Sequence, residues 1–413
     1  MPKPTTVPDY RVRAVHCDHR ASDEEIYHAL KRATAPLYRS WEKLRQAKTI
    51  GIKFNQDWPK PRMVIFENQR QQLVSDSVAR AVLRLLRENT SAKLYCVDSS
   101  FHTAYDGNTL DETTNLAHVF REFDIEYINC HDDIEWYETP GGGWMFKRYP
   151  LSRRLVETDA RVSVQKMKNH AFMGITLCLK NLFGLMPTEP EGRPRAYYHH
   201  LVRMPYMLAD LGRILNPALN IIDALVGQAG VEWGKGEGLG RIVDGLVAGD
   251  QVIATDACTA YLMGHDPQSD WLTQPFVRDR NPLLVAAEGG FGSVNLNDID
   301  FLSEIKPQPE GTFFAQVSDS QETVVSWRRT MCQQALYYRD HRSEFEKYTG
   351  EYILLQDGQV RWHDKTGHIT ISRRHLAGDN PDHAMWLKYV DPFDAEGERF
   401  EVYERELKKI EAM

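Results

Sequence analysis

An alternation of strand-like and helix-like segments over residues 49–129 constrains the fold most strongly. Three short apolar runs read as buried strands, and two segments between them carry apolar residues at helical spacing. The strands are expected at 49–54, 92–97 and 125–129 and the helices at 75–87 and 116–123. Strands and helices in this order are typical of right-handed βαβ units. The sequence therefore predicts an α/β fold, with a mostly parallel open sheet and flanking helices.

Further segments extend this pattern on both sides. We expect one helix over 22–46, strands at 161–165 and 218–225, a glycine-rich loop over 227–245, a helix at 257–263, and a strand followed by a turn at 282–292. The character changes after residue 311. A charged helix at 324–347, a hairpin centred on Asp357-Gly358 and a helical tail follow. The predicted domains are an α/β domain over 1–310 and a small α+β appendage over 311–413.

Composition excludes several classes of partner. Lysine and arginine total 50 against 58 acidic residues, a net charge of −8, which argues against a nucleic-acid or anionic-membrane surface. No apolar run reaches the roughly 18–20 residues of a membrane span. The first residues lack the apolar core of a signal peptide, so we expect a cytoplasmic protein. The six cysteines are scattered without a Cys-x-x-Cys pair, which argues against an iron–sulfur cluster.

Residues 160–184 contain the most informative segment. Three lysines, two asparagines and a histidine stand among apolar residues there, and a core segment rarely holds so many polar groups. The segment is therefore predicted to line a cleft that binds a small anionic ligand. Strand ends add polar residues to it, because ligands of open α/β sheets bind beyond the carboxyl ends of strands.

Each candidate residue has a predicted role. His170 would transfer a proton, because histidine titrates near neutral pH, and lysines would clamp an anion or depress one another's pKa. We assign catalysis to Lys168, His170 and Lys180, substrate binding to Lys53, Asn55, Lys166, Thr176, Asn181, Gly184 and His199, and cofactor binding to Asp223 and Asp256. The alternative is that the lysines are surface residues, His170 is structural and Asp256 caps a helix. The sequence leaves a divalent metal open as a cofactor.

The same segment resembles a bacterial and archaeal family known as domain of unknown function 362. The family's pattern is a strand, then Lys-x-Lys-x-His, then Thr-x-x-x-Lys-Asn-x-x-Gly, which corresponds here to Lys166, Lys168, His170, Thr176, Lys180, Asn181 and Gly184. Lys53-Phe54-Asn55 is similar to the family's Lys-Pro-Asn, and 249–256 is similar to its Gly-x-Asp-x-x-Ala-x-Asp. The resemblance spans about residues 45–300. Many members carry a ferredoxin-like cysteine motif, so it implies a member without the cluster and with an appended C-terminal module. The main domain is also similar in arrangement to nickel-cofactor lactate racemases.

Two functions remain open. In the first, the chain is an enzyme that acts on a small anionic metabolite by lysine and histidine acid–base chemistry, as an isomerase, racemase or lyase. In the second, it is a cofactor- or metal-binding protein related to the family's iron–sulfur members. Adjacent His199 and His200 point in different directions in most backbones, so a metal shared between them is not expected.

Overall fold

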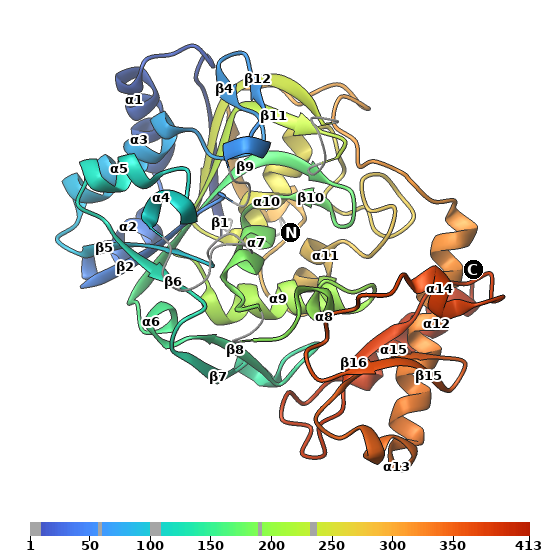
Figure 1. The fold of residues 1–413 in the computed structure, drawn as a ribbon. Helices are drawn as coiled ribbons and strands as arrows, with labels where there is room; N and C mark the ends of the chain where they lie inside the picture. Colours follow the sequence, from blue (N-terminus) through green and yellow to red (C-terminus); the bar gives the residue numbers. More distant parts are fainter. Residues whose placement is uncertain (1–9, 57–59, 100–108, 189–191, 232–237) are drawn as a thin grey trace, which may run out of the picture.

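A nine-stranded sheet organises the main body of the computed structural model, which describes residues 10–56, 60–99, 109–188, 192–231 and 238–413 (Figure 1). Along the sheet the order is β13 (Ile299–Ser303), β1 (Tyr10–His16), β12 (Leu239–Gly249), β11 (Leu219–Ala229), β9 (Ala160–His170), β2 (Thr49–Phe54), β5 (Lys93–Asp98) and β6 (Glu126–Asn129), with β10 (Gly174–Thr176) paired to β9. The strands from β11 to β6 pair in parallel, whereas β12 is antiparallel to β11 and β1. This confirms the predicted α/β class with a mostly parallel sheet.

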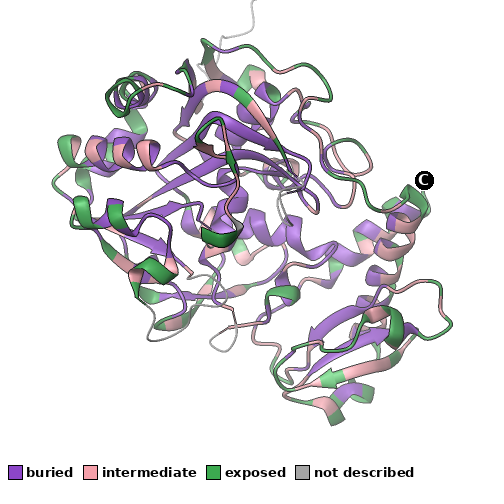
Figure 2. Cartoon of the chain, turned by 45° about the horizontal axis from the view of Figure 1, so that its top comes forward, coloured by how far each residue is buried: buried purple, intermediate pink, exposed green. Residues whose placement is uncertain are grey.

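Helices cover both faces of the sheet, so a hydrophobic core lies on each side. Successive side chains along β9 point to opposite faces and enter opposite cores. Val162 and Val164 join the core beneath α1 (Asp23–Thr34), α2 (Tyr38–Gln46), α3 (Asp76–Asn89) and α5 (Ala117–Glu122). Met167 joins the core on the other face, beneath α7 (Cys178–Asn181), α9 (Arg203–Leu215), α10 (Val252–Leu262) and α11 (Pro282–Glu288). Figure 2 shows the strands largely buried and the outer helix surfaces exposed. The sheet is therefore covered on both sides, and a ligand site has to lie at its edge.

Short elements complete the main body. They are the pairs β3 (Ile65–Phe66) with β4 (Gln69–Arg70) and β7 (Ile134–Glu138) with β8 (Arg148–Ser152), the helices α4 (Leu110–Thr113), α6 (Arg153–Val156) and α8 (Arg195–Tyr198), and 3-10 turns at Lys60–Arg62, Pro140–Gly142, Leu182–Leu185 and Leu296–Asp298.

The C-terminal unit, residues 321–411, packs a three-stranded sheet against two helices. Its strands are β14 (Tyr352–Gln356), β15 (Gln359–Asp364) and β16 (Trp386–Tyr389), its long helices are α12 (Gln321–Asp340) and α15 (Phe400–Glu411), and its short ones are α13 (Arg342–Phe345), Glu346–Tyr348 and α14 (Arg373–Ala377). The hairpin predicted around Asp357 is present.

Buried ion pairs join this unit to the main body. Arg203 Nη2 lies 2.7 Å from Glu398 Oε1, and both side chains are fully buried. Arg328 pairs with Asp279 of the main body and, at 2.7 Å, with Glu406. Because water cannot screen such contacts, they fix the C-terminal unit against the sheet domain. A division of the chain into domains at residue 310 stays a prediction.

Three predicted secondary-structure elements differ from the observed ones, in addition to the glycine-rich stretch described below. The helix expected over 22–46 is two helices, because Pro36 has no amide hydrogen with which to continue the first one. The segment expected as a strand at 282–292 is α11. Asn281 caps this helix through the Leu283 amide, and Pro282 occupies its first turn. The helix expected at 257 begins at Val252, where the Gln251 side chain accepts from the Ala254 amide.

The glycine-rich stretch 227–245 is mostly strand rather than loop, although 232–237 lies outside the described residues. Two of its described glycines leave space for neighbouring groups. A Cβ on Gly240 would lie 2.3 Å from the Phe66 ring, and one on Gly227 would lie 2.8 Å from the Met167 carbonyl oxygen. Pairing across the sheet therefore outweighs the usual weakness of glycine in strands.

Candidate functional site

The predicted site lies where the parallel strands end. Lys166, Lys168 and His170 occupy alternate positions of β9, so their side chains share one face of the sheet. Thr176 of β10 is the register partner of Lys168, and Gly174 is that of His170. Thr176 therefore lies in a strand, directly before the helix that carries Lys180. Its hydroxyl is buried and has no hydrogen-bond partner among the described residues.

The innermost lysine of this row is committed to a structural pair. Lys166 Nζ lies 3.1 Å from Asp223 Oδ1, and both side chains are fully buried. The amide and hydroxyl of Ser75 donate to the other Asp223 oxygen at 2.9 and 3.0 Å. Burial lowers the pKa of Lys166, an effect that the Asp223 charge opposes. The structure thus brings these two predicted residues together, and each is the ion-pair partner of the other.

Lys53 forms a second buried pair, on the sheet face opposite Lys168. Its Nζ lies 2.7 Å from Asp98 Oδ1 and donates to the Phe54 carbonyl at 2.9 Å. Gly184 is needed beside it, because a Cβ there would lie 2.9 Å from Lys53 Cε. Asn181 donates to the Lys53 carbonyl at 3.2 Å.

Asn55 is also buried and extends the strand pairing, donating its amide to the Val164 carbonyl. The predicted residues Lys53, Asn55, Asn181 and Gly184 therefore build the floor of the strand-end site.

His170 is held in one orientation. Its Nδ1 accepts the backbone amides of Phe172 and Met173 at 3.0 and 3.1 Å. Burial first, then the charges of Lys180, His199 and Lys168, hold the pKa of His170 well below its usual range. The ring is therefore neutral at pH 7 with its proton on Nε2, so His170 can donate a hydrogen bond but has no free nitrogen to accept a proton.

His199 stands beside it, half-buried on the turn after α8. The two imidazole centroids are 5.6 Å apart with 30° between their planes, and the Phe172 ring lies 4.5 Å from His199. Burial, followed by the charges of Lys180 and Arg195, holds the pKa of His199 well below its usual range. Two neutral imidazoles thus stand side by side among cations.

Two of these cations, Lys180 and Arg195, make cation–π contacts with one aromatic ring. Lys180 Nζ lies 4.8 Å and Arg195 Cζ 5.0 Å from the centre of the Phe183 ring. Phe183 itself lies 5.7 Å from His199. We call Lys168, His170, Lys180 and His199 the outer cationic group. Its members lie close enough for the charges of Lys180 and Arg195 to act on both histidines.

Asp256 holds the backbone of the helix that carries Lys180. Both of its carboxylate oxygens accept backbone amides, from Cys178 at 2.9 Å and Leu179 at 2.7 Å, at the start of the helix that carries Lys180. Burial raises the pKa of Asp256 to about 8. Asp256, which was predicted to bind a cofactor, therefore stabilises the first turn of the helix that carries Lys180.

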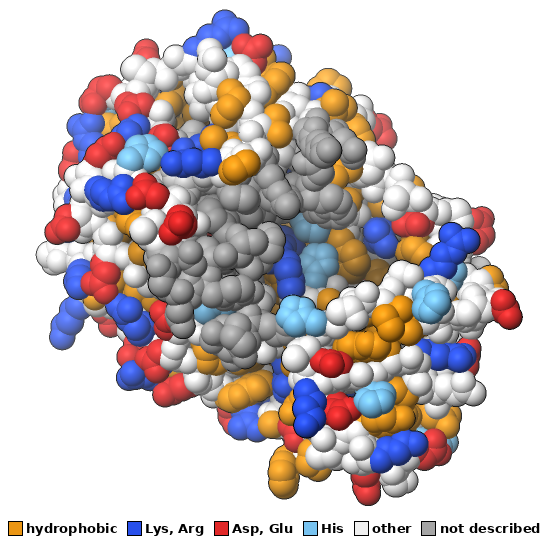
Figure 3. Space-filling model, viewed as in Figure 1, with side chains coloured by type: hydrophobic (Ala, Val, Ile, Leu, Met, Phe, Trp, Pro, Cys, Tyr) orange, Lys and Arg blue, Asp and Glu red, His pale blue; other side chains and the backbone are white. Residues whose placement is uncertain are grey.

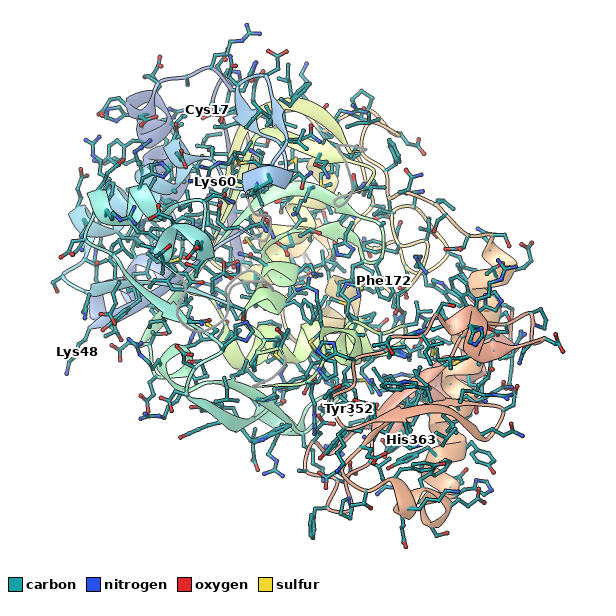
Figure 4. The ribbon with its side chains drawn as sticks, viewed as in Figure 1. Cys17, Lys48, Lys60, Phe172, Tyr352 and His363 are labelled. Carbon is teal, nitrogen blue, oxygen red and sulfur yellow. The ribbon has the colours of Figure 1, made fainter. Side chains whose placement is uncertain are left out.

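A pocket of about 250 Å³ opens next to His199, and we call it the junction pocket because both parts of the chain line it. Its lining includes Phe172, His199 and Arg278 from the main body and Trp327, Arg373 and His383 from the C-terminal unit. Figure 3 shows basic and hydrophobic side chains gathered in the hollow between the two parts. In Figure 4, Phe172 lies between the sheet and the C-terminal unit.

The sequence did not predict the parts that Arg195, Arg278 and Arg373 play here. No local pattern signals them, since each becomes relevant only through the tertiary path of the chain. The nearest hint in sequence is the Tyr197–His200 stretch, which brings aromatic and basic residues together.

Among the described residues, one group has the geometry of metal ligands, and it lies elsewhere. One ligand atom each from Asp18, His19 and Asp244 falls within 4.8 Å of the others. None of the three was predicted as a site residue. The six cysteines are free and buried, and burial raises the pKa of every thiol. Within the described chain, no helix has both the length and the apolar character required to cross a bilayer.

Comparison with known proteins gives three similarities. Residues 60–261 match the family model described as "Domain of unknown function (DUF362)". The thylakoid-associated protein sll1697 of Synechocystis sp. is 29% identical over 203 residues, which is 48% of this chain and 59% of that protein. The chain thus spans less than two thirds of that relative's length. A lactate racemase apoprotein structure from Thermoanaerobacterium thermosaccharolyticum has a TM-score of 0.32 at 16% identity, over 59% of this chain and 56% of that one.

Proposed function

We propose that the site at the strand ends of residues 60–261, the stretch that matches the DUF362 family model, binds a small organic anion and transfers a proton on it. The observation that carries the proposal is the convergence of the outer cationic group. The main causes that depress the pKa of His170 and His199, beyond burial, are the positive charges of neighbouring lysines and arginines. A site with that electrostatic character favours an anion.

The ligand would be held by charge and by neutral donors together. Lys168 and Lys180 supply the positive charge, and the Nε2–H of His170 supplies a directed hydrogen bond. The buried hydroxyl of Thr176, on the same face as Lys168, offers one more group to a bound oxygen. A carboxylate or a phosphate satisfies all four, because both present several acceptor oxygens.

The two histidines then take different roles in proton transfer. His170, with Nδ1 occupied by backbone amides, stabilises negative charge that develops on the substrate. His199 is half-buried, and no other described residue hydrogen-bonds to its ring, so we assign it as the base. The reaction class is an isomerisation, racemisation or elimination that begins by removing a proton next to the anionic group.

Binding is tested first, by isothermal titration with inorganic phosphate and with acetate. Lys168→Met and Lys180→Met should each weaken binding by about tenfold or more, the effect of one charge-assisted contact. Lys43→Met, on α2, serves as the control and should leave binding unchanged. If neither site variant alters the affinity for any anion, the site is not an anion site.

Chemistry is tested separately, by nuclear magnetic resonance. A panel of small 2-hydroxy acids in D₂O should show exchange of hydrogen for deuterium at the carbon beside the carboxylate with the wild-type protein. His199→Asn should retain anion binding and lose the exchange. Exchange that survives in this variant would remove His199 from the proposed role.

A further inference from the structure

The junction pocket continues the outer cationic group into the C-terminal unit. The His170 and His199 rings are neighbours, the Phe172 ring lies against His199, and the Arg278 guanidinium lies 5.4 Å from the centre of Phe172. Trp327 of α12 flanks Arg278 on another side, also at 5.4 Å. The junction pocket therefore borders the outer cationic group at His199, and Arg278 lines the same pocket.

The far end of the pocket carries a second cation, Arg373 on α14. Burial lowers the pKa of its guanidinium, and no charged group opposes that effect. No hydrogen bond or ion pair engages its side chain among the described residues. A partly desolvated guanidinium without a counterion is costly, so such a group is normally retained to meet a partner.

The electrostatic character of the pocket points the same way. Its described lining contains three arginines and three histidines but no aspartate or glutamate. Among the described residues, Arg278 forms one ion pair, Nη2 to Asp319 Oδ2 at 3.7 Å, and Asp319 does not line the pocket. An anion that entered here would meet charge-complementary groups on the main body and on the C-terminal unit at once.

We propose that the ligand carries two anionic groups, and that the second one, a carboxylate or a phosphate, is bound by Arg278 and Arg373 in the junction pocket. This inference rests on the proposed function, because the first anionic group is the one held by Lys168 and Lys180. The pocket volume, about 250 Å³, is below the roughly 300–1,000 Å³ of sites for drug-sized molecules, which limits the part of the ligand that enters the pocket to a small group.

The C-terminal unit then has a role in specificity. The buried pairs Arg203–Glu398 and Arg328–Asp279 join this unit to the main body, so Arg373 is presented at a fixed position rather than on a mobile arm. Fixed placement of a cation discriminates between ligands by length as well as by charge.

The test compares matched monoanions and dianions on the full chain. Affinities for acetate and propionate are measured by isothermal titration against those for malonate, succinate and glutarate, with phosphonoacetate as the mixed carboxylate–phosphonate probe. One dianion of the series should bind wild-type protein about tenfold or more tightly than the monoanions. Arg373→Met should reduce that ratio to near one while leaving the affinity for acetate unchanged, and Arg373→Lys should retain part of it.

Arg329→Met, an exposed arginine of α12 outside the pocket lining, is the matched control and should behave as wild type. A dianion preference that persists in Arg373→Met, or its absence from the wild type, overturns this inference but leaves the proposed anion site standing. If Lys168→Met has no effect on acetate or succinate binding, the proposed function itself fails. The preferred probe decides between a carboxylate and a phosphate-like second group.

Discussion

Lowering the pH should reduce the free energy of unfolding of this protein, in part through His200. Replacing His200 should make that reduction smaller. His200 is buried where the main body meets β16, with its Nε2 3.3 Å from the Met385 carbonyl and from the Leu387 amide. Burial, followed by the charge of Arg203, lowers its pKa from 6.5 to about 3.

The magnitude follows from these two pKa values. The unfolded chain takes up the proton near pH 6.5, whereas the folded chain takes it up only near pH 3, so between these values the unfolded state binds more protons. Stability therefore falls as the pH is lowered. Between pH 7 and pH 5 the contribution of His200 to this loss is about 2 kcal/mol.

The assay is urea unfolding followed by circular dichroism at both pH values. His200→Gln costs packing at every pH, so the informative quantity is the change in unfolding free energy between pH 7 and pH 5. We expect that change to be about 2 kcal/mol smaller in the variant than in the wild type. His16→Gln, at an exposed position, should keep the wild-type change. Equal changes in His200→Gln and wild type would refute the argument that burial keeps this imidazole neutral.

Three further predictions follow from buried groups. Lys166→Met should destabilise the fold by roughly 3–5 kcal/mol in urea unfolding, because it strands the Asp223 charge, and adding Asp223→Asn should recover part of the loss; equal stability of both variants would contradict this. The pKa of the Asp256 carboxyl is raised to about 8 in the folded protein, so this group stabilises the fold most at low pH. The unfolding free energy should therefore fall less between pH 6 and pH 8 in Asp256→Asn than in the wild type. The same fall in both proteins would contradict this prediction. The six thiols should react with Ellman's reagent only after denaturation, because all are buried with raised pKa values; rapid labelling of native protein would show an accessible cysteine.

Much of the sheet was predictable because its signals are local. Short apolar runs that end in polar residues correctly located β2, β5, β6 and the start of β9. The predictions failed where non-local contacts outweigh local preference. The glycines of β11 and β12 read as a loop, yet Phe66 and Met167 need the space that those glycines leave.

The sequence by itself determined that Lys166, Lys168 and His170 stand at every second position directly after a predicted strand. The structure continues β9 to His170, and alternate residues of a strand share a face. The sequence also placed Lys180 and Asn181 close behind in the chain. It could not show that Asp223 neutralises Lys166 while Lys168 faces the site, since that distinction depends on a neighbouring strand 57 residues away.

Only the tertiary structure decided the state of the histidines and the extent of the site. The backbone amides after His170 fix its tautomer, and the packing of the C-terminal unit brings Arg373 to a pocket that begins at His199. Both outcomes depend on burial and on contacts between distant parts of the chain. A linear pattern does not carry them, because burial and charge proximity are properties of the folded chain.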